Sequence, residues 1–169
     1  LIRLLTDLEG MSFDDALAIC KQVFSYTNHT ILAEALEKWS QHLMIATIPR
    51  VYDIIVKIDE AFGRDLAVKG VLGDKAKTMR IIQHETVHMA FMAIFASRYV
   101  NGVAQLHTEI LKDDVLKDWY AIYPERFQNK TNGITQRRWL ALCNPELSGL
   151  LTELLGSEAW KTDLSQLKK

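Results

Sequence analysis

The stretch from Phe127 to Trp139 has the residue types best suited to binding a ligand. It reads FQNKTNGITQRRW and places carboxamides, hydroxyls, cations and aromatic rings around a single glycine. It lacks the repeated apolar spacing of a core helix or core strand. Because a carboxamide both donates and accepts hydrogen bonds, it suits a sugar hydroxyl, which does the same.

Asn132 and Gly133 stand at the centre of this stretch. Asparagine and glycine tolerate positive φ angles, so the pair predicts a tight turn that presents the carboxamide and lets a ligand approach the backbone. The alternative is an ordinary Asn-Gly turn followed by a solvated pair of arginines, Arg137 and Arg138. Composition and spacing alone leave both readings open.

A second candidate lies in Tyr26-Thr27-Asn28-His29-Thr30, which joins two segments with helical patterns. Loops between rigid elements are where ligand contacts concentrate, so His29 is predicted to contact a ligand. The alternative is a histidine that caps a helix end. A third candidate group is Asn101, Gly102 and Val103, where a strand followed by a glycine turn into a helix would aim backbone N–H groups at a ligand.

His84-Glu85-Thr86-Val87-His88 matches the HExxH pattern of zinc peptidases. On a helix the two histidines would share one face and bind zinc, and the glutamate would activate water. Here the motif begins an apolar run that we interpret as a strand, in which residues i and i+4 lie about 13 Å apart. A zinc hydrolase is therefore kept only as the alternative function, and no metal site is predicted.

The apolar spacing predicts the elements that must position these residues. Helices are expected over residues 1–8, 12–25, 49–63, 103–112 and 144–156, with a short helix and a turn over 31–39 and a connection with some helix over 64–80. The run from Thr86 to Val100 lacks a clean period of 3.6 or 2, which favours a strand buried on both faces and leaves a buried helix as the alternative. Ser12, Pro49 and Asn144-Pro145 are expected helix starts, since Ser12 stands three residues before Asp15 as an N-cap would, and Gly63 and Gly156 are expected helix ends.

Composition excludes several classes of protein. The chain has 169 residues, 49% of them apolar, and a net charge of −1, so it lacks the basic surface of most nucleic-acid-binding proteins. No apolar run reaches the roughly 20 residues that would span a membrane. The two cysteines, Cys20 and Cys143, have no CxxC partner and fit a reducing compartment, so a cytoplasmic location is expected. The sequence begins within an apolar segment, without an initiator methionine, and we interpret it as a piece of a longer protein.

Four blocks of the sequence resemble the α-glucan (glycogen, starch or maltodextrin) phosphorylases, in the same order and at similar spacing. They are Tyr26–Thr30, Glu34–Trp39, Val100–Ala104 and Phe127–Trp139. The resemblance implies an α/β fold, a mostly helical segment with a few buried parallel strands from the centre of a two-domain, glycosyltransferase-B-like enzyme. It also implies a domain division, with residues 1–126 ending the N-terminal domain and 127–169 starting the cofactor-binding C-terminal domain.

The resemblance implies reversible phosphorolysis as the activity of the whole enzyme. Inorganic phosphate attacks the terminal α-1,4-linked glucose of a glucan and releases glucose 1-phosphate with retained configuration. The implied cofactor is pyridoxal phosphate, whose phosphate exchanges a proton with the substrate phosphate. The cofactor lysine is expected beyond Lys169, so the chain by itself is expected to be inactive. The implied full-length protein is a homodimer, with no nucleic-acid or membrane partner.

The resemblance also assigns roles to individual residues. His29 and Asn132 are the expected pair that hydrogen-bonds the glucose 6-hydroxyl, and His29 is the catalytic-site residue of this segment. Val103 is an expected wall of the same sugar pocket. Thr30 and Ala35 match residues that line the adjoining cavity, and Trp139 matches an aromatic residue near the cofactor.

Overall fold

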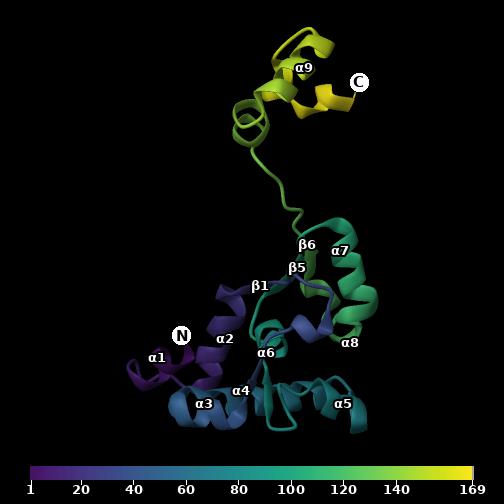
Figure 1. Cartoon of the computed structure of the whole chain (residues 1–169). Coiled ribbons are helices and arrows are strands. Elements are labelled where there is room, and N and C mark those ends of the chain that lie inside the picture. Colours follow the sequence, from purple (N-terminus) through teal and green to yellow (C-terminus); the bar gives the residue numbers. More distant parts are fainter. Residues whose placement is uncertain (169) are drawn as a thin grey trace. The chain divides into compact units, whose positions relative to one another are not determined.

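The computed structural model describes residues 1–168, which form two compact units, one from Leu1 to Thr131 and one from Asn132 onward. Each unit is described by itself (Figure 1). The predicted domain division at residues 126 and 127 stays a prediction; residues 127–129 form a strand of the first unit.

The elements of the first unit alternate between helices and short strands. Its helices are α1 (Ile2–Asp7), α2 (Phe13–Val23), α3 (Gln41–Thr47), α4 (Pro49–Val68), α5 (Gly73–Met79), α6 (Met89–Phe95), α7 (Gln105–Ile110) and α8 (Lys117–Ile122). Its strands are β1 (Ser25–Thr27), β2 (Lys38–Ser40), β3 (Ile82–Gln83), β4 (Thr86–His88), β5 (Tyr99–Gly102) and β6 (Phe127–Asn129). Short 3-10 turns at Ala33–Ala35 and Pro124–Arg126 and a π-helical turn at Leu111–Val115 complete the unit.

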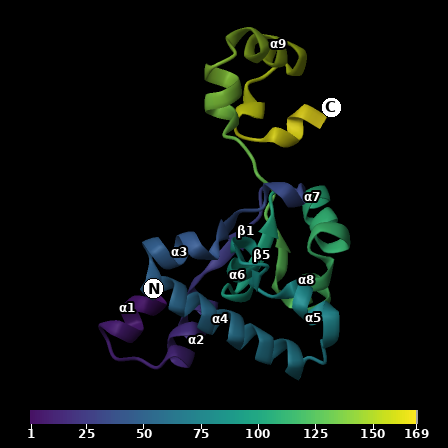
Figure 2. The ribbon, with the colours of Figure 1, turned by 60° about the horizontal axis from the view of Figure 1, so that its bottom comes forward.

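The first unit contains a parallel sheet with the strand order β1-β5-β6. Tyr26 pairs with Val100, and Val100 pairs with Phe127. Helix α6 packs against β1, and α7 packs against β5 and β6 (Figure 2). This confirms the predicted fold class, a mostly helical α/β segment with parallel strands. Because the strands are parallel, their carboxyl ends lie at one edge of the sheet.

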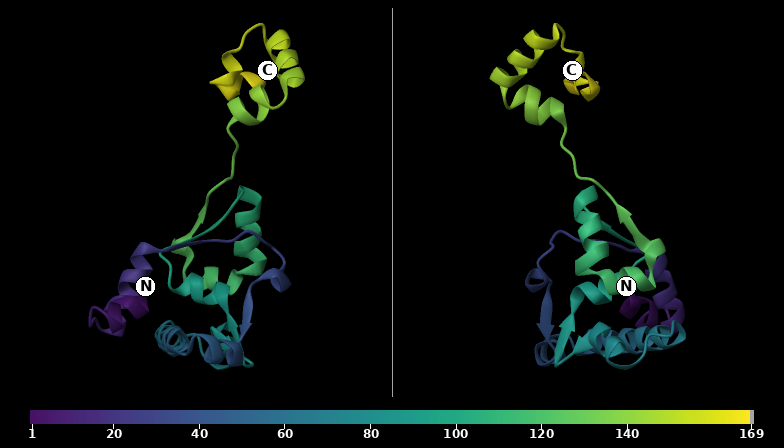
Figure 3. Two further views of the ribbon diagram at one scale, coloured as in Figure 1. Left: turned by 60° about the vertical axis from the view of Figure 1, so that its left-hand side comes forward. Right: turned by 90° about the vertical axis from the view of Figure 1, so that its right-hand side faces the viewer.

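A second, antiparallel sheet has the strand order β2-β4-β3. Strands β3 and β4 form a hairpin, and β2 lies beside β4 (right-hand view of Figure 3). Trp39 pairs with Val87 in this sheet, so the short helix expected over residues 31–39 is wrong. The segment forms one 3-10 turn and a strand instead, because the polar backbone of residues 38–40 pairs with β4.

Helix α4 supplies much of the core. Pro49 starts it as predicted, and its buried apolar side chains are Tyr52, Ile54, Ile55, Ile58, Phe62 and Leu66. The rings of Phe62 and Trp119 stack with 4.7 Å between centroids. The expected helix end at Gly63 is wrong, because the apolar stripe continues to Leu66 and the helix ends at Val68. The connection expected over 64–80 accordingly contains the last turn of α4 and all of α5.

The run from Thr86 to Val100 is not one strand. It divides into β4, helix α6 and β5, in which Ala90, Ile94 and Phe95 of α6 are buried. The alternative of a buried helix is therefore the correct one for residues 89–95. The period was obscured because half-buried residues such as Met92 occur between the fully buried ones.

Other predicted helices are confirmed, with shifts at their ends. The Ser12 hydroxyl accepts a hydrogen bond from the Asp15 N–H (3.1 Å) and caps α2 as the sequence indicated. The helix expected over 103–112 forms as α7 and the π-helical turn that follows it. None of the helices within residues 1–168 is long and apolar enough to cross a membrane.

The second unit contains a π-helical turn (Arg137–Leu142), helix α9 (Pro145–Leu155) and 3-10 turns at Ala159–Lys161 and Leu164–Lys168. Asn144 caps α9 by accepting a hydrogen bond from the Leu147 N–H (3.2 Å), and Gly156 ends the helix with φ 67°, both as predicted. Trp160 is fully buried. The predicted Asn132-Gly133 turn is wrong: neither residue has a positive φ, and the segment before Gln136 is irregular.

Candidate functional site

The candidate site is the edge of the parallel sheet at which β1, β5 and β6 end. Residues 28–30 follow β1, residues 103–104 follow β5 and residues 130–131 follow β6. In α/β folds, ligands bind at the carboxyl ends of parallel strands. The structure therefore brings three of the predicted site residues, His29, Thr30 and Val103, to an edge where ligand binding is expected.

Hydrogen bonds between side chains and backbone join the ends of β1 and β5. The Thr27 hydroxyl donates to the Asn101 side-chain oxygen (3.0 Å), and the Asn28 N–H donates to the Asn101 carbonyl (2.9 Å). The Asn101 side-chain amide donates to the Gly102 carbonyl (2.9 Å). Asn101 and Gly102 are the last residues of β5 and not the predicted turn, because their backbone pairs with β1 and β6. Asn101 thus orders the strand ends.

Asn28 fixes the shape of the loop that carries His29. Only 1% of Asn28 is exposed, and its Oδ1 accepts hydrogen bonds from the Thr30 N–H (2.9 Å) and from His107 Nε2 (3.1 Å). Its Nδ2 donates to the Tyr26 hydroxyl (3.4 Å), and burial raises the pKa of Tyr26, which keeps this phenol neutral. His29 lies between these anchored residues, and its side chain is exposed. The loop therefore holds the His29 backbone and presents its imidazole.

Helix α7 approaches the end of β5 closely. A Cβ atom at Gly102 would lie 2.6 Å from the Thr108 hydroxyl oxygen and 3.0 Å from Thr108 backbone atoms, so only glycine fits here. Half-buried Val103 follows, and its N–H donates to His107 Nδ1 (3.0 Å).

Thr108 connects α7 to the third strand end. This side chain is 1% exposed, and its hydroxyl lies 2.9 Å from the Ala104 carbonyl oxygen and 3.0 Å from Asn129 Oδ1. The Asn129 amide donates in turn to the Thr131 hydroxyl (3.0 Å). Residues of α7 therefore contact the ends of all three parallel strands.

The remaining predicted residues lie outside this edge or in the second unit. Ala35 is exposed in the 3-10 turn Ala33–Ala35. Asn132 is the first residue of the second unit, and Trp139 lies in its π-helical turn with 60% of its surface exposed. Because each unit is described by itself, the pairing of His29 with Asn132 stays a prediction.

Sequence reasoning did not single out Asn28 or His107. Asn28 lies beside the predicted histidine, and a buried asparagine cannot be distinguished from a solvated one by type alone. His107 had a usable signal: it stands four residues after Val103, at the spacing at which a helical side chain reaches back to the preceding turn. Its place at the sheet edge follows from its hydrogen bonds to Val103 and Asn28.

The His84–His88 motif does not form the helix that HExxH zinc binding requires. His84 (φ 46°) and Glu85 (φ 58°) form the tight turn between β3 and β4. His88 lies in β4, stacks on Phe91 at 5.0 Å, and has its pKa lowered by burial and by Lys38 and His84. Within residues 1–168 no group of three or more His, Cys, Asp or Glu side chains is placed to hold a metal ion.

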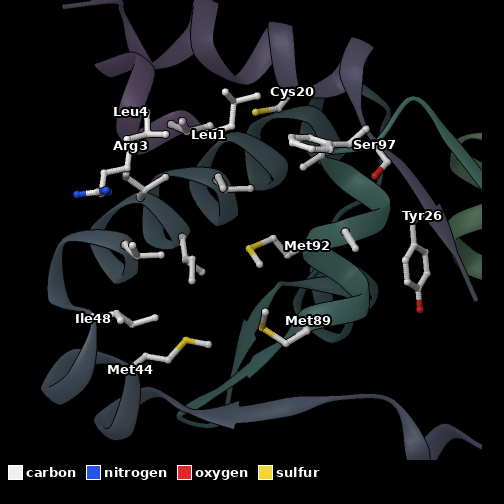
Figure 4. Close-up of a pocket in the computed structure, with 18 of the residues that line it drawn as sticks. Leu1, Arg3, Leu4, Cys20, Tyr26, Met44, Ile48, Met89, Met92 and Ser97 are labelled. Carbon is white, nitrogen blue, oxygen red and sulfur yellow. The ribbon is translucent and has the colours of Figure 1, made fainter. Parts of the chain in front are cut away.

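The first unit also contains a hollow away from this edge, between α1, α2, α4 and α6 (Figure 4). Its volume is about 600 Å³. Met44, Met89 and Met92 are among the mostly apolar side chains that line it, and Tyr26 lies at one side. It contains none of His29, Thr30 or Val103. An apolar cavity has few groups that could orient sugar hydroxyls, so its size does not make it the site.

Comparisons with known proteins agree with the resemblance seen in the sequence. The family model described as carbohydrate phosphorylase matches residues 1–169. The chain is 45% identical to the α-glucan phosphorylase H isozyme of Solanum tuberosum and 46% identical to the cytosolic α-glucan phosphorylase 2 of Arabidopsis thaliana. Each of these two matches covers 99% of the present chain. It is 44% identical over its full length to the muscle form of glycogen phosphorylase from Rattus norvegicus.

In each case the chain spans about 20% of the length of the relative. Nothing in these relatives supports the zinc hydrolase alternative. The match covers both units, including the strand ends that carry His29 and Val103 and the segment that carries Asn132 and Trp139. The chain belongs to the carbohydrate phosphorylase family.

Proposed function

We propose that this chain supplies part of the glucose site of an α-glucan phosphorylase, which we call the parent phosphorylase. That enzyme would reversibly cleave the terminal α-1,4-linked glucose of a glucan with inorganic phosphate and release glucose 1-phosphate. The observation that carries the proposal is the carboxyl edge of the β1-β5-β6 sheet, where a hydrogen-bond network around buried Asn28 holds Thr30, Val103 and the loop that carries His29. The names of the relatives indicate the glucan as substrate.

Each residue has a role that its chemistry allows. The His29 imidazole and the Asn132 carboxamide would hydrogen-bond the glucose 6-hydroxyl, and Val103 would contact the apolar side of the same hydroxymethyl group. Thr30 and Ala35 would line the adjoining cavity. Imidazole and carboxamide groups suit a hydroxyl because they donate and accept hydrogen bonds. Loss of one buried partner of a hydroxyl costs about 1–3 kcal/mol.

The donor groups described at the three strand ends do not by themselves form a cofactor site. Pyridoxal phosphate needs an amine to bind its aldehyde and an enclosed set of donors for its phosphate. The strand ends offer amides, hydroxyls and imidazoles, and the amine that follows β6, on Lys130, is exposed. We therefore place the cofactor lysine in the part of the parent phosphorylase that this chain does not cover, and Trp139 beside the cofactor. The chain by itself would be inactive.

The proposal extends to location and assembly. A cytoplasmic enzyme fits the cytosolic relative from Arabidopsis thaliana. The partners would be an α-1,4-glucan, inorganic phosphate and a second copy of the parent phosphorylase. Neither nucleic acid nor a membrane is among them, in keeping with the net charge of −1.

Substitution of the two proposed sugar contacts tests the assignment. In the parent phosphorylase, His29→Ala and Asn132→Ala should each lower kcat/KM for phosphorolysis at least about tenfold, the equivalent of about 1.4 kcal/mol. His84→Ala is the matched control, because His84 is also an exposed histidine and lies in the β3-β4 turn. Its activity should equal that of the wild type. Unchanged activity in both test variants would contradict the proposed site.

A further inference from the structure

His107 lies in α7, between two of the loops that form the candidate site. It is half-buried, and both of its ring nitrogens have partners. Nδ1 lies 3.0 Å from the Val103 backbone nitrogen, and Nε2 lies 3.1 Å from Asn28 Oδ1. The two partners follow different strands of the sheet: Asn28 follows β1, and Val103 follows β5, which pairs with β1.

The partners determine which nitrogen of His107 carries the proton. A backbone N–H can only donate, so Nδ1 must be the acceptor for Val103, and Nε2 carries the hydrogen in the neutral ring. Nε2 then donates to Asn28 Oδ1, which also accepts from the Thr30 N–H (2.9 Å). The imidazole therefore forms a directed bridge from the Val103 backbone to the side chain that shapes the His29 loop.

The Thr27 hydroxyl donates to Asn101 Oδ1 (3.0 Å), but that contact joins the strands themselves; among the hydrogen bonds described for residues 1–168, the His107 bridge is the one that joins the residues after β1 to the residue after β5 through a side chain. The Asn28 N–H to Asn101 carbonyl bond continues the strand pairing and sets the spacing of the backbones. Thr108, the next residue of α7, contacts the Asn129 end of β6. Within residues 1–168, His107 is thus the side chain whose hydrogen bonds fix the position of Val103 relative to the residues on both sides of His29.

We propose that His107 is a positioning residue for recognition of the sugar 6-hydroxymethyl group. It touches no substrate and acts by holding Val103 and the Asn28–Thr30 loop at the separation that this group requires. This inference rests on the proposed function, because it takes His29 and Val103 as the walls of the 6-position pocket. It adds a residue to which neither the motifs nor the relatives assign a role.

The test measures discrimination at the 6-position and not activity alone. In the parent phosphorylase, kcat/KM in the direction of glucan synthesis is compared for glucose 1-phosphate and xylose 1-phosphate, which lacks the 6-hydroxymethyl group. A site that hydrogen-bonds a hydroxyl rejects an analogue without it. His107→Ala should lower the glucose-to-xylose ratio at least tenfold. Glu109→Ala is the control, because Glu109 lies in α7 but is exposed and makes no contact with the His107 bridge, and its ratio should equal that of the wild type.

Two further variants separate the halves of the bridge. In His107→Asn the amide oxygen can replace Nδ1 as the acceptor for Val103 but cannot reach Asn28. In His107→Gln the amide nitrogen can replace Nε2 as the donor to Asn28 but leaves the Val103 N–H without its acceptor. Both ratios should lie between those of the wild type and His107→Ala. A purely structural role predicts equal losses for both substrates, with unchanged ratios in all three variants, and that result would overturn the inference.

Failure of the inference and failure of the proposed function give different results. If His29→Ala abolishes the discrimination and His107→Ala leaves it unchanged, the proposed function stands and His107 is not a positioning residue. If His29→Ala also leaves the ratio unchanged, both are wrong.

A measurement on the unsubstituted 169-residue chain tests the bridge without a variant. Long-range ¹H–¹⁵N spectra should show a neutral His107 ring protonated at Nε2. A ring protonated at Nδ1 could not accept from Val103 and would overturn the inference.

Discussion

The carboxyl edge of the β1-β5-β6 sheet and the hairpin formed by β3 and β4 both carry histidines, and they differ in what surrounds the rings. At the sheet edge, both nitrogens of His107 have hydrogen-bond partners, and Asn28 is 1% exposed. At the hairpin, Glu85 approaches His42 to 3.8 Å, and both side chains are 77% exposed. Ion pairs that are this exposed contribute little to stability.

The two regions also differ in how the sequence presents them. The hairpin carries a contiguous five-residue motif with a familiar chemical meaning. The sheet edge is assembled from segments that lie far apart in the sequence, such as Asn28 and His107 at a separation of 79 residues. The difference teaches that a short motif indicates a chemistry only where the backbone has the conformation that this chemistry needs. The backbone at the sheet edge is held in place by buried polar groups whose hydrogen bonds are made.

The largest expected effect on stability is at the sheet edge. Asn28→Ala leaves the Thr30 N–H and the His107 ring without their acceptor in a buried place, so the first unit should lose about 3 kcal/mol. Urea unfolding of the chain, followed by the NMR signals of buried methyl groups such as that of Val100, would measure the loss. His84→Ala at the hairpin should change stability by less than about 0.5 kcal/mol. Equal losses in the two variants would contradict the comparison.

Gly102→Ala should cost about 2 kcal/mol, because the added methyl group would meet Thr108 side-chain and backbone atoms at 2.6 to 3.0 Å and α7 would have to shift. The same urea experiment measures this loss. The amide of Val103 should also exchange its hydrogen faster, since displacement of α7 weakens its bond to His107. A variant with wild-type stability and a wild-type rate of hydrogen exchange at Val103 would mean that α7 does not approach Gly102 as closely as described.

Glu85→Gly should have the opposite sign and stabilise the first unit by about 1 kcal/mol. Glu85 has a φ of 58°, which costs free energy for a residue with a side chain and none for glycine. The ion pair that it loses with His42 is too exposed to offset the gain. A destabilised variant would show that the hairpin turn depends on the Glu85 side chain, as a functional motif would.

The smallest expected effect is the pH dependence that comes from His88. Burial, Lys38 and His84 lower the pKa of His88 below 6.5, so the unfolded chain binds the proton more readily than the folded chain. Stability from this residue is therefore present above pH 6.5 and is lost as the pH falls through the folded pKa. His88→Phe, which keeps the stacking on Phe91, should lessen the decrease in urea midpoint between pH 7.5 and 5.5. The same decrease in variant and wild type would exclude His88 as its source.

The sequence predicted much of the fold where local signals decide it. The Ser12 cap, the Pro49 start of α4 and the Asn144 and Gly156 ends of α9 all depend on neighbouring residues, and all are confirmed. The run 86–100 hides its period because half-buried residues occur between the fully buried ones. Helix α4 passes Gly63 because its apolar stripe continues to Leu66.

Local signals also singled out three residues of the sheet edge, and their role in sugar binding stays a prediction. His29, Thr30 and Val103 follow strand ends, and the structure brings them to one edge of the parallel sheet. Asn28 could not be identified, because its contact with His107 joins residues distant in the sequence, and the only sequence signal of His107 is its spacing of four residues from Val103. The positive φ angles expected at Asn132 and Gly133 occur instead at His84 and Glu85, where the geometry of the hairpin overrides residue preference.

A crystal structure of the parent phosphorylase with bound glucose tests the central claim most directly. The account predicts the glucose 6-hydroxyl within about 3 Å of both the His29 imidazole and the Asn132 carboxamide, with Val103 in contact with the hydroxymethyl carbon. Glucose bound away from the carboxyl ends of β1 and β5, with the His29 imidazole facing solvent, would contradict it.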